Sequence, residues 1–116
     1  RLLVIDDEPE VLDVLKEMLA SLGHAVTAAS RGPEGLALLE RERYDLVLTD
    51  LAMPGMTGWQ VAQAVKSRWP DLPVILLTGW ADQVDPSHTS WADRLLKKPF
   101  QLGQIEETLA ALLPDK

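Results

Sequence analysis

The chain has 116 residues, of which 47% are hydrophobic and 25% charged, a composition that fits one soluble globular domain and excludes disorder and collagen. It contains no cysteine, so disulfide bonds, thiolate zinc sites and a cysteine nucleophile are excluded. Its formal net charge of −7 has the wrong sign for a phosphate backbone, and we therefore expect no direct binding to nucleic acid.

The first half of the chain alternates between apolar runs and segments of helical periodicity. The first strand is expected at residues 2–5, followed by a helix that begins at an acidic, proline-containing segment and ends at Gly23. A second strand is expected at residues 25–29, and another helix begins near Ser30. The third strand is expected at residues 45–49. This alternation favours parallel strands joined by crossover helices.

The second half continues the same alternation. Residues 53–58 are rich in turn formers, so the third helix is expected to start near Trp59. Residues 85–90 contain a proline and make a poor helix. The last two strands and the last helix are expected at residues 74–77, 94–97 and 104–113. The whole pattern predicts an α/β fold, a flavodoxin-like doubly wound five-stranded parallel sheet of order 2-1-3-4-5 with helices on both faces.

Polar side chains collect where the predicted strands end. Asp6 and Asp7 follow the first strand, and Asp50 follows the third. Thr78 follows the fourth strand and Lys98 the fifth. In a sheet of this order the first and third strands are neighbours at the switch point where ligands bind, so we expect the three carboxylates to converge.

Converging carboxylates imply a particular chemistry. Three of them repel one another, and one would bind a proton unless a divalent cation compensates their charge. Oxygen ligands without histidine or cysteine favour a hard ion, Mg²⁺ first and Mn²⁺ second. Lys98 and Thr78 could then hold the oxygens of a phosphoryl group, with Asp50 as the nucleophile, because a carboxylate needs no activating base. The predicted product is an aspartyl phosphate.

Over essentially its whole length the chain resembles the receiver domains of two-component response regulators. The residues that carry the resemblance are Asp6-Asp7, Asp50 within LTDLAMPGMTG, Thr78 within ILLTG, and Lys98-Pro99-Phe100. Each motif alone is weakly specific, whereas the ordered set is strongly specific. The segment PDLPVILLTGWADQ is similar to receivers of hybrid sensor histidine kinases.

The resemblance implies phosphorelay signalling by a domain that is not an enzyme but assists its own phosphorylation and dephosphorylation. Asp50 would accept a phosphoryl group from the histidine of a kinase or phosphotransfer domain, and the domain would then switch conformation. The resemblance also implies a metal held by Asp7, Asp50 and the backbone carbonyl of Ala52, with Asp6 acting mainly through water. The output domain or partner is not identified by the sequence.

The same resemblance identifies Thr78 as the switch hydroxyl and Lys98 as the site lysine, and it exposes one departure. The family places an aromatic ring in the last strand, three residues before the lysine, where this chain has Leu95. Residues 101–113 also lack the basic side chains that receivers of one large transcription-factor family use to dimerise. We therefore expect a monomer or weak dimer.

The sequence also bears on the parent protein of this domain and on its location in the cell. Residues 1–116 are expected to form a single receiver domain excised from a longer protein, because Arg1 already lies in an apolar run without an initiator methionine. The longest apolar stretch, residues 72–77, is short and contains Pro73, so we expect no membrane insertion and a cytoplasmic location.

Three alternative functions fit the sequence less well. An Mg²⁺-dependent phosphatase with an aspartate nucleophile typically carries a second aspartate two residues further on, where this chain has Ala52. A nucleotide-binding module would need a glycine-rich turn after the first strand, which is absent. A pseudo-receiver that only binds proteins is disfavoured because every site residue is present.

Overall fold

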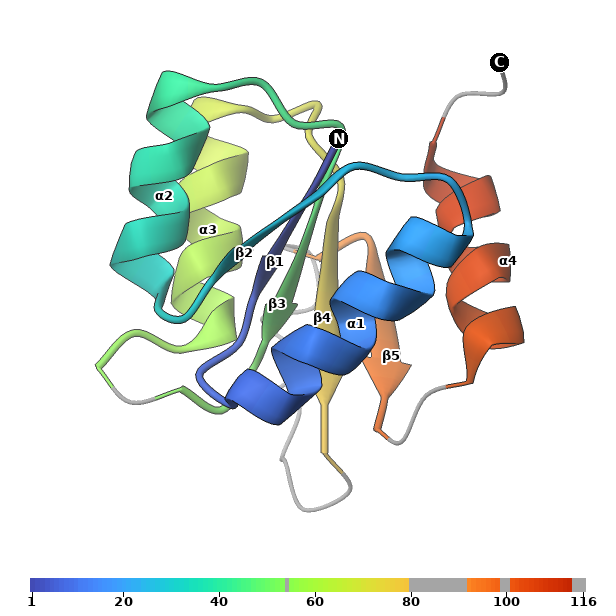
Figure 1. The fold of residues 1–116 in the computed structure, drawn as a ribbon. Helices are drawn as coiled ribbons and strands as arrows, with labels where there is room; N and C mark the ends of the chain where they lie inside the picture. Colours follow the sequence, from blue (N-terminus) through green and yellow to red (C-terminus); the bar gives the residue numbers. More distant parts are fainter. Residues whose placement is uncertain (54, 80–91, 99–100, 114–116) are drawn as a thin grey trace.

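The computed structural model describes residues 1–53, 55–79, 92–98 and 101–113. Pro54, Pro99, Phe100 and the segment 85–90 lie outside the described residues. Strands and helices alternate from residue 2 to residue 78, as the sequence predicts, and a last strand and helix follow in the described chain (Figure 1). In chain order the elements are β1 (Leu2–Ile5), α1 (Pro9–Ser21), β2 (Val26–Ala29), α2 (Gly32–Arg41), β3 (Leu46–Asp50), α3 (Gly58–Arg68), β4 (Val74–Thr78), β5 (Arg94–Lys97) and α4 (Leu102–Leu112).

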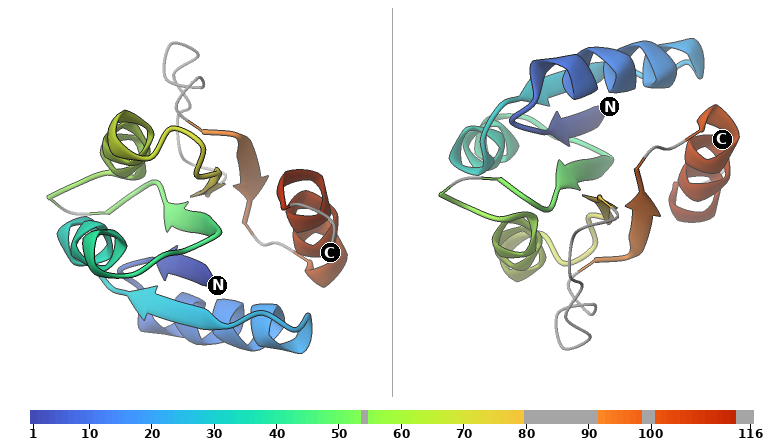
Figure 2. Two further views of the ribbon diagram at one scale, coloured as in Figure 1. Left: turned by 90° about the horizontal axis from the view of Figure 1, so that it is seen from above. Right: turned by 90° about the horizontal axis from the view of Figure 1, so that it is seen from below.

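The strands form one parallel sheet of order β2-β1-β3-β4-β5, which confirms the predicted fold class. Helices α1 and α4 cover one face of the sheet and α2 and α3 the other, as the two views of Figure 2 show. Strands β1 and β3 are neighbours at the centre, so their carboxyl ends open at the same edge. In the described part of the chain, no helix is both long and apolar enough to cross a bilayer.

The core has two layers because successive side chains of each strand point to opposite faces. On one face Leu2 and Val4 pack with residues of α1 and α4. On the other face Leu3 and Ile5 pack with residues of α2 and α3. All four side chains are completely buried, which explains why β1 reads as a continuous apolar run instead of an alternating one.

Strands β3 and β4 each end one residue later than the sequence predicts. Asp50 is the last residue of β3 and Thr78 the last of β4. The ladder continues past the apolar runs because the N–H of Leu51 donates to the carbonyl oxygen of Leu77 at 3.0 Å. The N–H of Lys98 likewise donates to the carbonyl oxygen of Thr78 at 2.7 Å. The backbones of Asp50 and Thr78 are therefore fixed by the hydrogen bonds of the sheet.

Helix α4 begins two residues earlier than the sequence predicts, at Leu102 instead of residue 104. The backbone N–H of Gln101 donates to Oε1 of Gln104 at 3.0 Å, which satisfies a donor just before the first turn. Gly103 weakens the helical signal of this turn in the sequence, so periodicity alone places the start too late.

Candidate functional site

The predicted carboxylates do converge at the carboxyl ends of β1 and β3. Asp6, Asp7, Glu8 and Asp50 each offer a carboxylate oxygen, and these oxygens all lie within 4.8 Å of one another. The first three residues follow one strand and the fourth ends its neighbour, so the parallel pairing of β1 with β3 is what brings them together. The sheet topology thus explains why Asp50 meets the carboxylates that follow β1.

Lys98 supplies a positive charge to the cluster from the end of the fifth strand. Its Nζ lies 3.0 Å from Oδ1 of Asp50 and 3.4 Å from Oδ2 of Asp6. A third carboxylate, that of Glu8, lies 4.0 Å away at the exposed rim. Four carboxylates facing one ammonium leave a formal charge of −3 when all are ionised. The site is thus prepared for a further cation.

Burial makes the charged forms of Asp50 and Asp6 less favourable than they would be in water. Burial raises the pKa of Asp50 to about 6; the hydrogen bond from Lys98 opposes the shift, and the charges of Asp6 and Asp7 add to it. Burial also raises the pKa of Asp6, although the backbone N–H of Glu8 and the nearby ammonium stabilise its charged form. The expectation that one carboxylate would tend to hold a proton in the absence of a metal is consistent with these shifts.

Burial alone would lower the pKa of Lys98, but the hydrogen bond to Asp50 and the charges of Asp50 and Asp6 raise it above its usual value. The ammonium therefore stays charged throughout the physiological range. It can serve as a fixed counter-charge for any anion that enters beside Asp50.

The donor set fits a hard divalent cation. Oδ1 of Asp7 is buried and has no hydrogen-bond partner among the described residues, although buried carboxylate oxygens are normally paired. Asp50 is only 3% exposed and brings a second anionic oxygen to the same place. Unpaired, closely spaced carboxylate oxygens are the ligands that Mg²⁺ prefers.

The two remaining predicted residues lie at the same edge of the sheet. Thr78 is buried and stands one position beyond Leu77, the residue that pairs in register with Asp50. Ala52 is exposed and lies in the loop that follows β3, two residues after Asp50. The topology therefore places all of the predicted site residues around the ends of the three central strands and β5.

Sequence reasoning missed Glu8. Its carboxylate belongs to the cluster, and its backbone N–H donates to Oδ1 of Asp6 at 2.9 Å. The sequence signal is its place directly after Asp6 and Asp7, but an acidic residue before a proline suits a helix start equally well. Glu8 thus has two roles, at the start of α1 and at the rim of the site.

Leu95 is the second residue of the edge strand β5. Leu95 pairs in register with the buried Leu76, yet it is itself 41% exposed on the edge strand. A leucine here leaves apolar surface exposed on the edge strand.

The charge cluster makes the stability of the metal-free protein depend on pH. The folded state binds an extra proton between the ordinary pKa of Asp50, 3.8, and its folded value of about 6. The resulting stabilisation is complete below the lower value and is lost as the pH rises through the higher one. We therefore expect Asp50→Asn, which cannot ionise, to raise the free energy of unfolding by about 1–2 kcal/mol near neutral pH, and by less near pH 5.

Urea unfolding of both proteins in EDTA at the two pH values measures this difference. Equal stabilities of the wild type and the variant at neutral pH would contradict the electrostatic strain inferred at Asp50.

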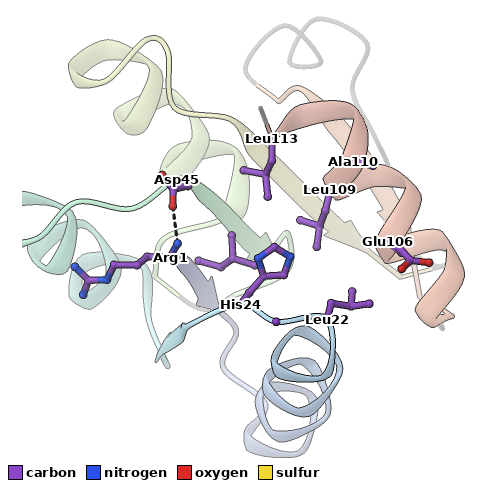
Figure 3. Close-up of a pocket in the computed structure, with 10 residues that line it drawn as sticks. Arg1, Leu22, His24, Asp45, Glu106, Leu109, Ala110 and Leu113 are labelled. Carbon is purple, nitrogen blue, oxygen red and sulfur yellow. Dashed lines mark hydrogen bonds and ion pairs between the residues drawn. The ribbon is translucent and has the colours of Figure 1, made fainter. Parts of the chain in front are cut away.

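A cavity of about 620 Å³ lies at the opposite edge of the sheet and does not belong to this site. Figure 3 shows it between the end of α1 and helix α4, with Arg1, His24 and Asp45 at the amino ends of the strands. Its apolar lining includes Leu109 and Leu113 from the last helix segment. This cavity is thus separate from the charge cluster.

Comparison with known proteins agrees with this geometry. A family model described as "Response regulator receiver domain" matches residues 2–110. The transcriptional regulatory protein AfsQ1 of Streptomyces coelicolor is 35% identical over 114 residues, which is 97% of this chain and 50% of that protein. TctD of Salmonella typhimurium is 39% identical over 116 residues, again 97% of this chain and 51% of that protein. The chain therefore spans about half the length of these curated relatives.

Among solved structures, the response regulator TrrA of Thermotoga maritima in complex with Mg²⁺-BeF is similar, with a TM-score of 0.91 and 34% identity. The alignment covers 97% of this chain and 98% of TrrA. TrrA has also been solved in complex with the histidine kinase ThkA, with a TM-score of 0.90 to this chain. The similarity thus extends over the whole sheet and its helices.

Proposed function

Because this chain belongs to the family of response regulator receiver domains and acts in phosphorelay signalling, we propose that Asp50 is its phosphoacceptor. The single observation that carries the proposal is the environment of this carboxylate. It is almost completely buried, lies 3.0 Å from the ammonium of Lys98 and belongs to the same cluster as Asp7, whose Oδ1 accepts no hydrogen bond from any described residue. An acyl phosphate formed there would have a cationic partner ready for its new charge.

The other residues of the site assist the transfer. Lys98 and Thr78 would hold phosphoryl oxygens and orient them for in-line attack by Asp50, so most of the rate enhancement would come from positioning. In this way the domain would assist its own phosphorylation and dephosphorylation. Ala52 stands where aspartate-nucleophile phosphatases have their acid-base residue. Its presence supports a signalling domain in preference to an enzyme that hydrolyses phosphate esters repeatedly.

Asp7, Asp50 and the backbone carbonyl of Ala52 are the residues that would hold Mg²⁺, with Asp6 acting through water. When bound, the ion would neutralise negative charge shared by the carboxylates and the incoming phosphoryl group. The oxygen-only donor set supports Mg²⁺, and Mn²⁺ is the alternative ion that suits the same ligands. The Mg²⁺-BeF complex of TrrA, a relative of the same fold, adds support.

Replacing Asp7 by Asn should weaken Mg²⁺ binding by at least about tenfold, because it removes an anionic charge whose buried Oδ1 has no hydrogen-bond partner in the described part of the chain. Isothermal titration calorimetry on the metal-free protein measures the change. Asp71→Asn is the matched control, since that exposed residue lies after α3 and outside the cluster. Equal Mg²⁺ affinity in wild type and Asp7→Asn would remove Asp7 from the proposed ligands.

The proposed function is tested by incubating the chain with acetyl phosphate and Mg²⁺. Intact mass spectrometry should show the addition of one phosphoryl group, and peptide mapping should place it at Asp50. The phosphatase alternative predicts continuous release of phosphate from a phosphate ester without a stoichiometric limit. Such turnover, or a phosphoryl group on another residue, would refute the proposal.

The proposed function includes a phosphodonor protein and a longer parent chain. The complex of TrrA with ThkA supports a histidine kinase, or a phosphotransfer domain, as the phosphodonor of this chain. The relatives are about twice as long, which supports residues 1–116 as a single receiver domain of a longer protein. A monomer or weak dimer, a cytoplasmic location and a possible hybrid-kinase origin remain the predictions made from the sequence.

A further inference from the structure

Gly58, the first residue of α3, touches the backbone of the acceptor segment. A Cβ atom built on Gly58 would lie 2.4 Å from the carbonyl oxygen of Asp50 and 2.8 Å from Cα of Leu51. Both distances are shorter than non-bonded atoms tolerate, and both partners are backbone atoms that cannot rotate away. Only a residue without a side chain therefore lets α3 start this close to β3.

The same residue is also tied to the acceptor segment by a hydrogen bond. The N–H of Gly58 donates to the carbonyl oxygen of Leu51 at 2.9 Å, which closes the loop that contains Ala52. The preceding residue, Thr57, caps the helix: its Oγ1 accepts from the N–H of Gln60 at 3.3 Å, and its own N–H donates to Oε1 of Gln60 at 2.8 Å. The first turn of α3 is thus fixed against the residues that follow Asp50.

We propose that Gly58 is a positioning residue, which sets where the Asp50 carboxylate and the Ala52 carbonyl lie. The proposal rests on the function proposed above, because it assigns Gly58 a role toward the same acceptor and ligands. A methyl group at residue 58 must push back the backbone of Asp50 and Leu51, so the oxygens carried by this segment move with it. Displacements of well under 1 Å are enough to weaken a metal site or an in-line attack.

Gly35 offers a matched control for this proposal. A Cβ there would meet Cδ1 of Ile5 at 2.3 Å and Cγ1 at 2.8 Å, a contact at least as tight as that at Gly58. These atoms, however, belong to a flexible side chain in the core layer covered by α2 and α3. Gly35→Ala should therefore cost stability through core packing without moving the acceptor backbone.

The experiment compares wild type, Gly58→Ala and Gly35→Ala in Mg²⁺ titrations and in phosphorylation by acetyl phosphate, at a temperature where circular dichroism shows each protein folded. We expect Gly58→Ala to weaken Mg²⁺ binding by about tenfold and to slow phosphorylation at saturating Mg²⁺ by a similar factor. Gly35→Ala should stay within about twofold of wild type in both, even if its melting temperature is the lower of the two.

Thr57→Ala carries the same test if Gly58→Ala does not fold. It loosens the first turn of α3 without introducing a clash, and we expect Mg²⁺ binding to weaken by about threefold at a modest cost in stability. The proposal for Gly58 would be overturned if Gly58→Ala, or Thr57→Ala in its place, folds and binds Mg²⁺ with the affinity of the wild type. It would also be overturned if Gly35→Ala lost as much Mg²⁺ affinity as Gly58→Ala. Failure of the wild type itself to bind Mg²⁺ and accept phosphate would instead overturn the proposed function.

Discussion

Asp50→Asn is expected to abolish phosphorylation by acetyl phosphate, the largest effect that any single substitution in this chain should have. An amide has no anionic oxygen with which to attack phosphorus. Among the described carboxylates, that of Asp50 lies closest to Lys98, with Oδ1 3.0 Å from Nζ. Intact mass spectrometry after incubation with phosphodonor and Mg²⁺ should show no added phosphoryl group.

The control for this prediction is that the variant remains folded. Asn has nearly the same shape as Asp and should relieve the electrostatic strain that raises the pKa of Asp50, so the variant is expected to be at least as stable as wild type. Asp71→Asn, at an exposed position, should be phosphorylated normally. A phosphoryl group acquired by folded Asp50→Asn at the wild-type rate would identify another acceptor.

Lys98→Ala should separate metal binding from catalysis. The ammonium lies 3.0 Å from Asp50 and 3.4 Å from Asp6, so its removal deletes a cation that competes with Mg²⁺ for the same carboxylates. Mg²⁺ binding is therefore expected to tighten by about threefold. Phosphorylation at saturating Mg²⁺ should nevertheless slow by about 100-fold, because a preorganised partner for the phosphoryl oxygens is lost.

Calorimetry gives the metal affinity, and mass spectrometry over time gives the rate. Lys97→Ala is the matched control: it removes a lysine from the adjacent, exposed position of β5 and should leave both quantities unchanged. Weaker Mg²⁺ binding in Lys98→Ala would mean that the ammonium organises the carboxylates more than it competes with the ion. A normal phosphorylation rate would exclude Lys98 from the transfer.

Much of the site could be predicted from the sequence because topology, once known, dictates which strand ends meet. Apolar runs and helical periodicity predict the parallel sheet, and the sheet order then makes Asp6, Asp7 and Asp50 neighbours. Hydropathy predicts the ends of β3 and β4 one residue too early, because Asp50 and Thr78 are polar and their backbone hydrogen bonds leave no signal in the sequence.

The features that the sequence could not predict depend on distances between segments. The clustering of Glu8 required knowing which way α1 leaves β1, since an acidic residue before a proline also suits a helix start. The contact of Gly58 with the Asp50 backbone depends on how closely α3 approaches β3, which no periodicity encodes. The pKa of Asp50 likewise follows from burial, which exists only in the folded chain.

The hydrogen bond between the N–H of Lys98 and the carbonyl oxygen of Thr78 has a mechanical consequence. The side chains of Thr78 and Lys98 would hold the phosphoryl oxygens, and their backbones are joined by this N–H to O=C hydrogen bond of 2.7 Å. A shift of either residue toward a ligand would therefore strain the hydrogen bond or move the other residue. A phosphoryl group that attracts either side chain would thus displace the ends of the adjacent strands β4 and β5 together. Such a route runs through main-chain atoms and works equally well with a leucine at residue 95.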